Sequence, residues 1–177
     1  MTPQADAQLT DKRIDPPVQA DEKATILAFL GYQRQTLLLK CAGLTPVQLL
    51  ARSCPPSQLC LLGLVRHLCE VEFGWLHSRF AGEPDREIYG PGDADLDVTE
   101  ADEASVAETF ARYAEFVARS QQIVAGAAPD DLTALAHPRT GEHFSLRWIL
   151  DHLVEEYARH NGHADLLRQA IDGAVGE

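Results

Sequence analysis

The stretch SLRWILDHLVEEYARHNGHADLLRQAIDG, residues 145–173, decides the fold. Its apolar residues recur every three or four positions, as Ile149, Leu153 and Leu167 show, which is the spacing of one face of an α-helix. Polar and charged residues fill most of the positions between them. The pattern therefore predicts a long amphipathic helix over residues 146–171 that packs one face into a core.

Three more long segments upstream have helical periodicity, and none shows the alternation of a β-strand. Two of the connections between the long segments are long, and one of them, residues 83–98, is rich in Gly, Pro and Asp. The sequence thus predicts an all-α, four-helix bundle with a short extra helix and long crossover loops. The expected segments are a helix from an Asp21 N-cap to about Cys41, a short helix over 46–52 behind a Thr45 capping box, a helix over 58–80 behind Ser57, a loop over 83–98, a helix over about 100–126 behind Thr99 and Asp102, and a loop over 127–144 with strand-like pairing around Thr140 and Gly141.

Length and composition fit one domain. The chain has 177 residues, of which 45% are hydrophobic, enough for a single packed core. We expect residues 1–20 to be a flexible tail and residues 21–177 to form the bundle. The four cysteines form no C-x-x-C pair and are expected to be reduced thiols, and a metal role for Cys60 or Cys69 has little support.

Charge and hydropathy limit the classes of partner. The formal net charge is -12, with no cluster of Lys and Arg, which disfavours binding to nucleic acid or to anionic lipid. No apolar run approaches the ~20 residues of a membrane span, and the polar N-terminus lacks a signal-peptide core. We therefore expect a cytoplasmic protein that acts on a small molecule.

Two polar residues lie inside the apolar stripe of the last helix. On a helical wheel Glu156 and His160 fall about 20° to either side of Ile149. Their i, i+4 spacing places the side chains one above the other. Burying a carboxylate without a partner is costly, so a divalent metal that binds both is one solution, and a simple hydrogen-bonded pair is the other.

A third metal ligand is expected from the second long helix. His67 is the best candidate, although the wheel places it at the flank of that helix's apolar stripe. Glu72 lies closer to the centre of the stripe and is the rival, either as a ligand or as a partner of a ligating imidazole. His152 and His163 lie further round the last helix and are candidates for additional ligands, outer partners or proton shuttles.

Two motifs together carry a family resemblance. Residues 61–76, LLGLVRHLCEVEFGWL, and residues 145–173 resemble the DinB-like superfamily, most closely its DUF664 branch. The resemblance implies an up-down-down-up four-helix bundle with a metal near one end of the core. It implies one His ligand from the second helix, here His67, and two ligands four residues apart from the last helix, of which the second is His160.

The first of those two last-helix positions is often His in the superfamily, and here it is Glu156. The mycothiol-dependent maleylpyruvate isomerases, which this chain also resembles, carry the pattern His…Glu-x-x-x-His on zinc. The resemblance therefore implies a metal-binding transferase or isomerase that uses mycothiol, a low-molecular-weight thiol, on an electrophilic small molecule. Zinc is the first choice of metal, with nickel, iron or manganese as the others.

Three alternatives stay open at this stage. One is a metal-dependent hydrolase, in which Glu70 or Glu72 acts as general base. Another is a non-catalytic, stress-linked metal-binding bundle. A calcium loop at Asp93, Asp95 and Asp97 is a minor possibility, because the residues that should complete it are missing. A homodimer is expected only because twofold dimers are the commonest oligomers.

Overall fold

A computed structural model describes residues 11, 13–90 and 102–175. These residues form helices and no β-strand, with one isolated bridge between Leu132 and Ser145. The all-α prediction is thereby confirmed. The elements in chain order are α1 (Glu22–Cys41), α2 (Pro46–Leu49), α3 (Leu61–Glu72), the π-helix η1 (Phe73–Phe80), α4 (Glu103–Ala125) and α5 (Leu146–Asp172).

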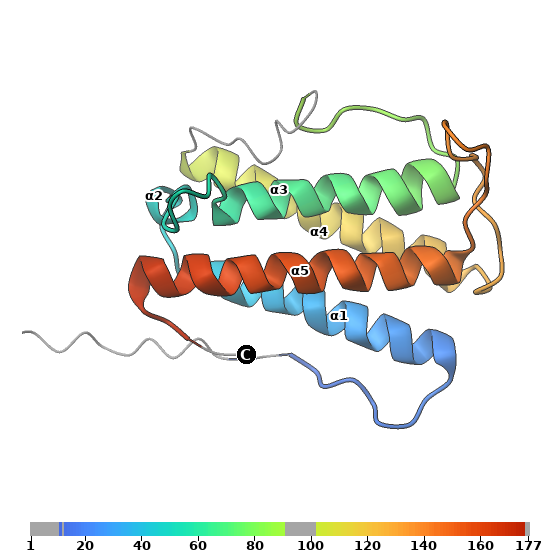
Figure 1. The fold of residues 1–177 in the computed structure, drawn as a ribbon, viewed down its shortest axis with the longest axis horizontal. Helices are drawn as coiled ribbons and strands as arrows, with labels where there is room; N and C mark the ends of the chain where they lie inside the picture. The colour runs from blue at the N-terminus through green and yellow to red at the C-terminus, as the bar shows by residue number, and fades with distance from the viewer. Residues whose placement is uncertain (1–10, 12, 91–101, 176–177) are drawn as a thin grey trace, which may run out of the picture.

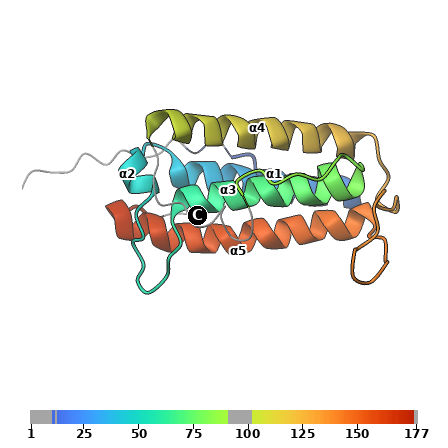
Figure 2. The ribbon, with the colours of Figure 1, turned by 90° about the horizontal axis from the view of Figure 1, so that it is seen from above.

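Four long rods lie side by side in an up-down-down-up arrangement (Figure 1). The first and last, α1 and α5, run in one direction, while α3 with η1 and α4 run in the other. In the view from above, α3 lies in front of α1 between α4 and α5, with the short α2 at one end (Figure 2). The closest packing joins α1 to α5 and α3 to α4. Parallel α3 and α4 require the long crossover that the sequence predicts between them.

The helix ends follow their capping residues. Asp21 accepts a hydrogen bond from the Ala24 amide, and Ser145 accepts one from the Trp148 amide, as predicted. The Thr45 capping box is also present, although α2 ends at Leu49, earlier than expected.

The predicted start of the third helix is wrong. Ser57 accepts a hydrogen bond from the Leu59 amide within a turn, and the helix begins only at Leu61 with Cys60 as N-cap. The Cys60 sulfur accepts from the Gly63 amide at 3.4 Å. A thiol is a weak cap, which explains why the sequence pattern favoured the serine upstream.

The same helix also changes its winding. Residues 61–72 are α-helical, but Phe73–Phe80 form a π-helix with a wider turn. The prediction of one regular helix to residue 80 is therefore wrong beyond Glu72. Phe73, Leu76, His77 and Ser78 are the buried residues of this π-helical segment.

The core runs along the whole bundle between the four rods. It consists mainly of leucine and aromatic side chains from all of the long helices, and Tyr157 is its largest fully buried side chain. Ile149, Leu153 and Leu167, which mark the predicted apolar face of the last helix, are among these residues. Core members include Leu30, Leu37, Leu64, Leu68, Phe73, Leu76, Tyr113, Phe116, Ile149, Leu153, Tyr157 and Leu167.

The loop before α5 is a turn and not a pair of strands. The His137 amide donates to the Glu142 carbonyl, and the Gly141 amide donates to the His137 carbonyl. Antiparallel pairing does flank Thr140 and Gly141, because the Thr133 amide donates to the Phe144 carbonyl and Leu132 forms an isolated bridge with Ser145, but it does not extend into full strands.

Other predictions concern regions that are only partly described. Residues 1–10 of the expected tail, and Asp93, Asp95 and Asp97 of the possible calcium loop, lie outside the described residues. Arg13 donates to Thr36 on α1. The division into a tail over 1–20 and a bundle over 21–177 stays a prediction, as does the homodimer.

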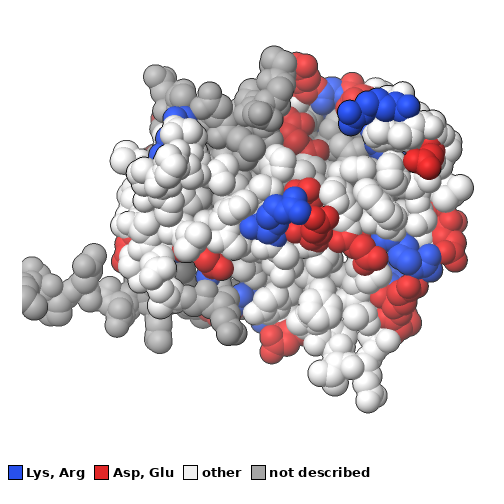
Figure 3. Space-filling view, viewed as in Figure 1, with Lys and Arg blue, Asp and Glu red and all other residues white. Residues whose placement is uncertain are grey.

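The surface carries the charge that the composition requires. On the face seen in Figure 3, Lys and Arg side chains lie next to Asp and Glu and do not form a continuous basic patch. Within the described part of the chain, none of the helices combines the length and hydropathy of a membrane span.

Candidate metal centre

The structure brings His67, Glu156 and His160 together across the α3–α5 contact. One potential ligand atom from each lies within 4.8 Å of the other two. Glu156 Oε2 is 3.4 Å from His160 Nε2 and 3.8 Å from His67 Nε2. The rings of His67 and His160 meet edge to face, with centroids 4.7 Å apart. The two elements that carry the family motifs therefore meet at one point.

This cluster lies at the edge of the core and not at its centre. The side chains of His67, Glu156 and His160 are 24%, 15% and 11% exposed. The wheel prediction that Glu156 lies mid-stripe is wrong, because α5 packs against both α1 and α3, which widens its buried face and moves its centre toward Tyr157. A cluster at the edge can receive a small molecule from solvent.

The electrostatic environment favours a neutral His160. Burial, together with the charge of a protonated His67, lowers the pKa of His160 to about 4, against the opposing effect of Glu156. At neutral pH the ring therefore keeps a lone pair on one nitrogen. A neutral imidazole is the form that binds a metal ion.

His163 lies on the far side of His160. Its Nδ1 is 3.4 Å from His160 Nδ1, whereas His160 Nε2 faces Glu156. One of the two Nδ1 atoms can carry the proton and donate it to the other. If His160 is the donor, its Nε2 is left as the free lone pair that points to the cluster.

His152 continues the row on the other side of Glu156. Its Nε2 is 3.6 Å from Glu156 Oε1, and its Nδ1 is 3.3 Å from Glu155 Oε2. The His152 ring stacks on Trp148 and meets Trp75 edge to face. Two tryptophans thus hold the ring of His152 beside the cluster.

Glu72 does not contact the candidate ligands, so its predicted role as rival ligand or imidazole partner is wrong. The side chain is fully buried and accepts two hydrogen bonds from Arg34, at 2.7 and 2.8 Å. Tyr157 donates a third at 2.9 Å. The carboxylate charge is thus balanced inside the bundle by a cation from α1.

Arg34 and Tyr157 are the polar residues that the sequence analysis missed. Arg34 lies between Leu30 and Leu37, at spacings of four and three residues on the buried face of α1. A cation at such a position signals a buried acidic partner, which is Glu72. Arg168 on α5 is a second buried cation, and it donates to the carbonyls of Lys40 and Ala42.

The cysteines lie away from the cluster. All four are free thiols. Cys60 caps α3, and Cys69 accepts a hydrogen bond from Tyr89 at 3.8 Å. Burial raises the pKa of the Cys69 and Cys41 thiols to about 12.

The donor set of the cluster fits a divalent metal ion. Two imidazoles and a carboxylate are a known catalytic set for zinc, with bonds of about 2.0–2.2 Å. Donor atoms around such a tetrahedral ion lie roughly 3.3–3.5 Å apart, which follows from those bond lengths. The separations of 3.4 and 3.8 Å at Glu156 are close to this value, so small side-chain rotations would complete the geometry.

Comparison with known proteins gives the family. A sequence model described as mycothiol-S-transferase matches residues 25–173. This range includes all of the helices except the first three residues of α1, and it includes the three candidate ligands. This chain belongs to the mycothiol-S-transferase family. No curated protein matches the sequence.

Membership of the mycothiol-S-transferase family confirms the predicted relation to mycothiol-linked proteins. It supports a mycothiol-related transferase activity and, with it, a small-molecule substrate. The metal is a separate matter, since only the grouping of the three side chains points to it.

Proposed function

We propose that this protein is a metal-dependent transferase that joins the thiol of mycothiol to an electrophilic small molecule. His67, Glu156 and His160 hold the ion, which is zinc in first place. The observation that carries the proposal is that these three donors come together where the two family motifs meet.

Three protein ligands suit a catalytic ion, because tetrahedral coordination then keeps one position for a substrate. A divalent ion held there supplies Lewis acidity that lowers the pKa of a thiol and yields a nucleophile at neutral pH. The partial exposure of His67 and Glu156 lets the thiol and the electrophile approach from solvent.

The remaining histidines orient the ligands and handle protons. His163 accepts the Nδ1 proton of His160 and so directs His160 Nε2 toward the cluster. His152, fixed between Trp75 and Trp148, can take up the thiol proton and pass it to solvent through Glu155, its hydrogen-bond partner. Both histidines thus keep the shuttle or positioning roles expected of them.

A hydrolase is less well supported, because its expected general bases are occupied. Glu72 is bound to Arg34 and Tyr157. Glu70 accepts hydrogen bonds from the amides of Ile88 and Tyr89, which holds the crossover against α3. Neither carboxylate is placed to activate a water molecule at the cluster.

The activity test combines the metal, the thiol and a panel of electrophiles. Zinc-loaded protein is mixed with mycothiol and with haloalkyl, epoxide and maleimide compounds, and the loss of free thiol is followed. We expect consumption that requires both zinc and mycothiol, that is lost in Glu156→Gln and that persists in Glu115→Gln. Glu115 is an exposed acid on α4, so this control makes the same change away from the cluster.

Two results would contradict the proposal. One is thiol consumption no faster than in the metal-free sample across the panel. The other is substrate turnover by zinc-loaded protein without any thiol, which would indicate the hydrolase.

A further inference from the structure

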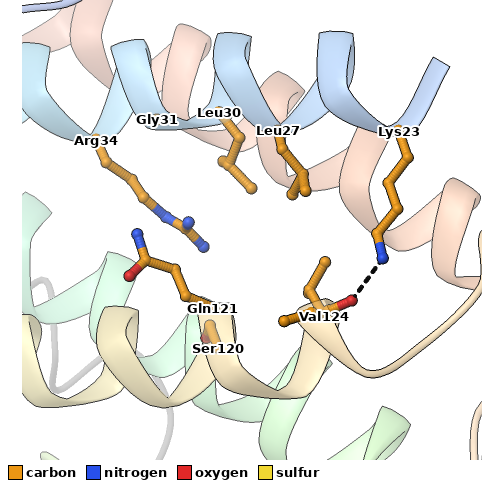
Figure 4. Close-up of a pocket in the computed structure, with 9 residues that line it drawn as sticks. Lys23, Leu27, Leu30, Gly31, Arg34, Ser120, Gln121 and Val124 are labelled. Atoms are coloured by element: carbon orange, nitrogen blue, oxygen red, sulfur yellow. Dashed lines mark hydrogen bonds between the residues drawn. The ribbon is translucent and has the colours of Figure 1, made fainter. Parts of the chain in front are cut away.

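The bundle is open along one seam. A cavity of about 250 Å³ lies between α1 and α4 (Figure 4). Close packing joins α1 to α5 and α3 to α4, but α1 and α4 share few contacts. The loose packing of α1 against α4 therefore leaves a space between these two helices. Ligand sites in helical bundles form in such spaces.

The wall of this cavity differs in charge from the rest of the molecule. It contains two cations and no acidic residue, in a chain whose net charge is -12. Apolar side chains make up the middle of the wall. The lining residues are Lys23, Leu27, Leu30, Gly31, Arg34, Ser120, Gln121, Val124 and Ala125.

Arg34 lies at the inner end of the cavity and has one nitrogen that forms no hydrogen bond to the described residues. Its Nε and Nη2 bind the two oxygens of Glu72. Its Nη1 has no hydrogen-bond partner among the described residues, while the guanidinium as a whole is almost fully buried. Figure 4 shows the Gln121 amide extending from α4 toward this guanidinium. Two N–H donors from facing helices thus meet at one end of the cavity.

Lys23 marks the other end. Its ammonium donates to the carbonyls of Val124 and Ala127, at 2.8 and 2.6 Å, where α4 ends (Figure 4). An ammonium has three donors, so one remains. Between the two cations lie Leu27, Leu30 and Val124, which offer only hydrocarbon.

We propose that this cavity is a binding site for a small apolar carboxylic acid. Its carboxylate accepts hydrogen bonds from Arg34 Nη1 and the Gln121 amide, and its hydrocarbon part lies along the leucines toward Lys23. A cavity of 150 Å³ holds benzene, so by proportion the present one holds about ten non-hydrogen atoms. Because Glu72 balances the charge of Arg34, the preference for an anion depends on the unused Nη1 donor of Arg34 and on the ammonium of Lys23, which neutral and cationic molecules of the same size match less well.

The site is distinct from the candidate metal centre. It lies between α1 and α4, whereas His67, Glu156 and His160 lie on α3 and α5. None of the lining residues belongs to the cluster. Binding of the acid therefore does not depend on the proposed transferase activity, and either proposal can fail alone.

The direct test is calorimetry with three probes on the full chain, without added metal. The probes are hexanoate, hexanamide and hexylammonium, which share one chain and differ in the charge of the head group. We expect hexanoate to bind with a dissociation constant on the order of 1 mM, the range open to so small a ligand. Hexanamide and hexylammonium should bind at least about tenfold more weakly.

A cavity-filling variant locates the site. Gly31 is a helical residue at which an added Cβ would meet no atom within 4 Å, so Gly31→Leu fills the cavity without touching Arg34 or Glu72. Gly162 on α5 also has open space but does not line the cavity, so Gly162→Leu is the matched control. Both replace a helical glycine and should raise the melting temperature by about 2–4 °C. Only Gly31→Leu should weaken hexanoate binding, by more than about tenfold.

A charge variant tests the head-group end. Gln121 is exposed on α4, so Gln121→Glu should fold normally while placing a carboxylate opposite Arg34. We expect it to weaken hexanoate about tenfold and to strengthen hexylammonium. The proposal is overturned if hexanoate and hexanamide bind alike, if hexanoate shows no saturable binding, or if Gly31→Leu binds hexanoate as well as Gly162→Leu does.

Discussion

Two carboxylates of the bundle, Glu72 on α3 and Glu156 on α5, differ in burial and in the side chains around them. Glu72 is fully buried and receives three hydrogen bonds of 2.7–2.9 Å, two from Arg34 and one from Tyr157. Glu156 is partly exposed, and its nearest cationic or polar partners are ring nitrogens of three histidines, at 3.4, 3.6 and 3.8 Å.

The difference separates a structural acid from a candidate metal ligand. The contacts of Glu72 have the length of charge-assisted hydrogen bonds and leave the carboxylate charge balanced. The contacts of Glu156 are longer, and the imidazoles around it offer lone pairs as readily as protons. Such a group of donors suits a divalent cation. Adjacent residues of α5 serve both places, since Tyr157 points to Glu72 while Glu156 points to His67.

The largest effect is expected from breaking the structural pair. Arg34→Met leaves the buried Glu72 carboxylate without its cation, which should lower the free energy of unfolding by about 3–5 kcal/mol. Urea denaturation followed by circular dichroism measures the change.

The double variant Arg34→Met/Glu72→Met is the control for that experiment. Because it removes both charges together, it should recover most of the stability lost in the single variant. If Arg34→Met cost less than about 1 kcal/mol, the buried pair would not be the fixed framework that the contrast with Glu156 requires.

The same kind of change at Glu156 should act on metal affinity and leave stability nearly unchanged. Glu156→Gln removes a ligand charge at a partly exposed position, so the metal-free protein should keep its free energy of unfolding within about 0.5 kcal/mol. Zinc affinity, measured by competition with a chromophoric chelator, should fall more than about 100-fold, beyond the loss typical of outer partners. Glu115→Gln should bind zinc like the unchanged protein; equal zinc affinity in both variants would rule out the centre.

The sequence contains enough to predict the fold and the grouping of the candidate ligands. Helical periodicity and capping residues at Asp21, Thr45 and Ser145 mark the helices, because these signals are local. The sequence made His67 the best candidate for a third ligand, the family resemblance implied the same residue, and the structure places the two elements accordingly. Whether an ion binds there stays a prediction.

What the sequence did not reveal depends on packing between distant helices. Glu72 is a rival of His67 in the sequence because it lies near the centre of the apolar stripe, and its actual partner, Arg34, is 38 residues away on another helix. The depth of Glu156 was overestimated because a wheel drawn for one helix does not include the second neighbour of α5. The π-helix after Glu72 changes the register of Trp75 and His77, and no local rule announces it.

A smaller effect is expected at the outer partner of the cluster. His163→Ala removes the group that faces His160 Nδ1, so His160 can place its proton on either nitrogen. Zinc affinity should fall about 10- to 100-fold, less than in Glu156→Gln. His163→Asn restores an acceptor and should recover part of the affinity, which a purely steric role would not predict. Equal zinc affinity in His163→Ala and the unchanged protein would remove His163 from the proposed site.

The smallest effect concerns the buried thiol of Cys69, which lies on the same helix as His67. Burial is the main reason that its pKa is raised to about 12, and the hydrogen bond from Tyr89 only partly opposes this. The thiol of Cys69 therefore stays protonated at any pH well below 12. At pH 8 only about one molecule in ten thousand carries the thiolate. Cys69→Ser should therefore leave mycothiol consumption unchanged, and a disulfide reagent at pH 8 should label the native protein at Cys54, the cysteine that is not buried. Rapid labelling of Cys69, or loss of turnover in Cys69→Ser with zinc affinity intact, would instead assign the reacting sulfur to the protein and would make the comparison of the two carboxylates irrelevant to the chemistry.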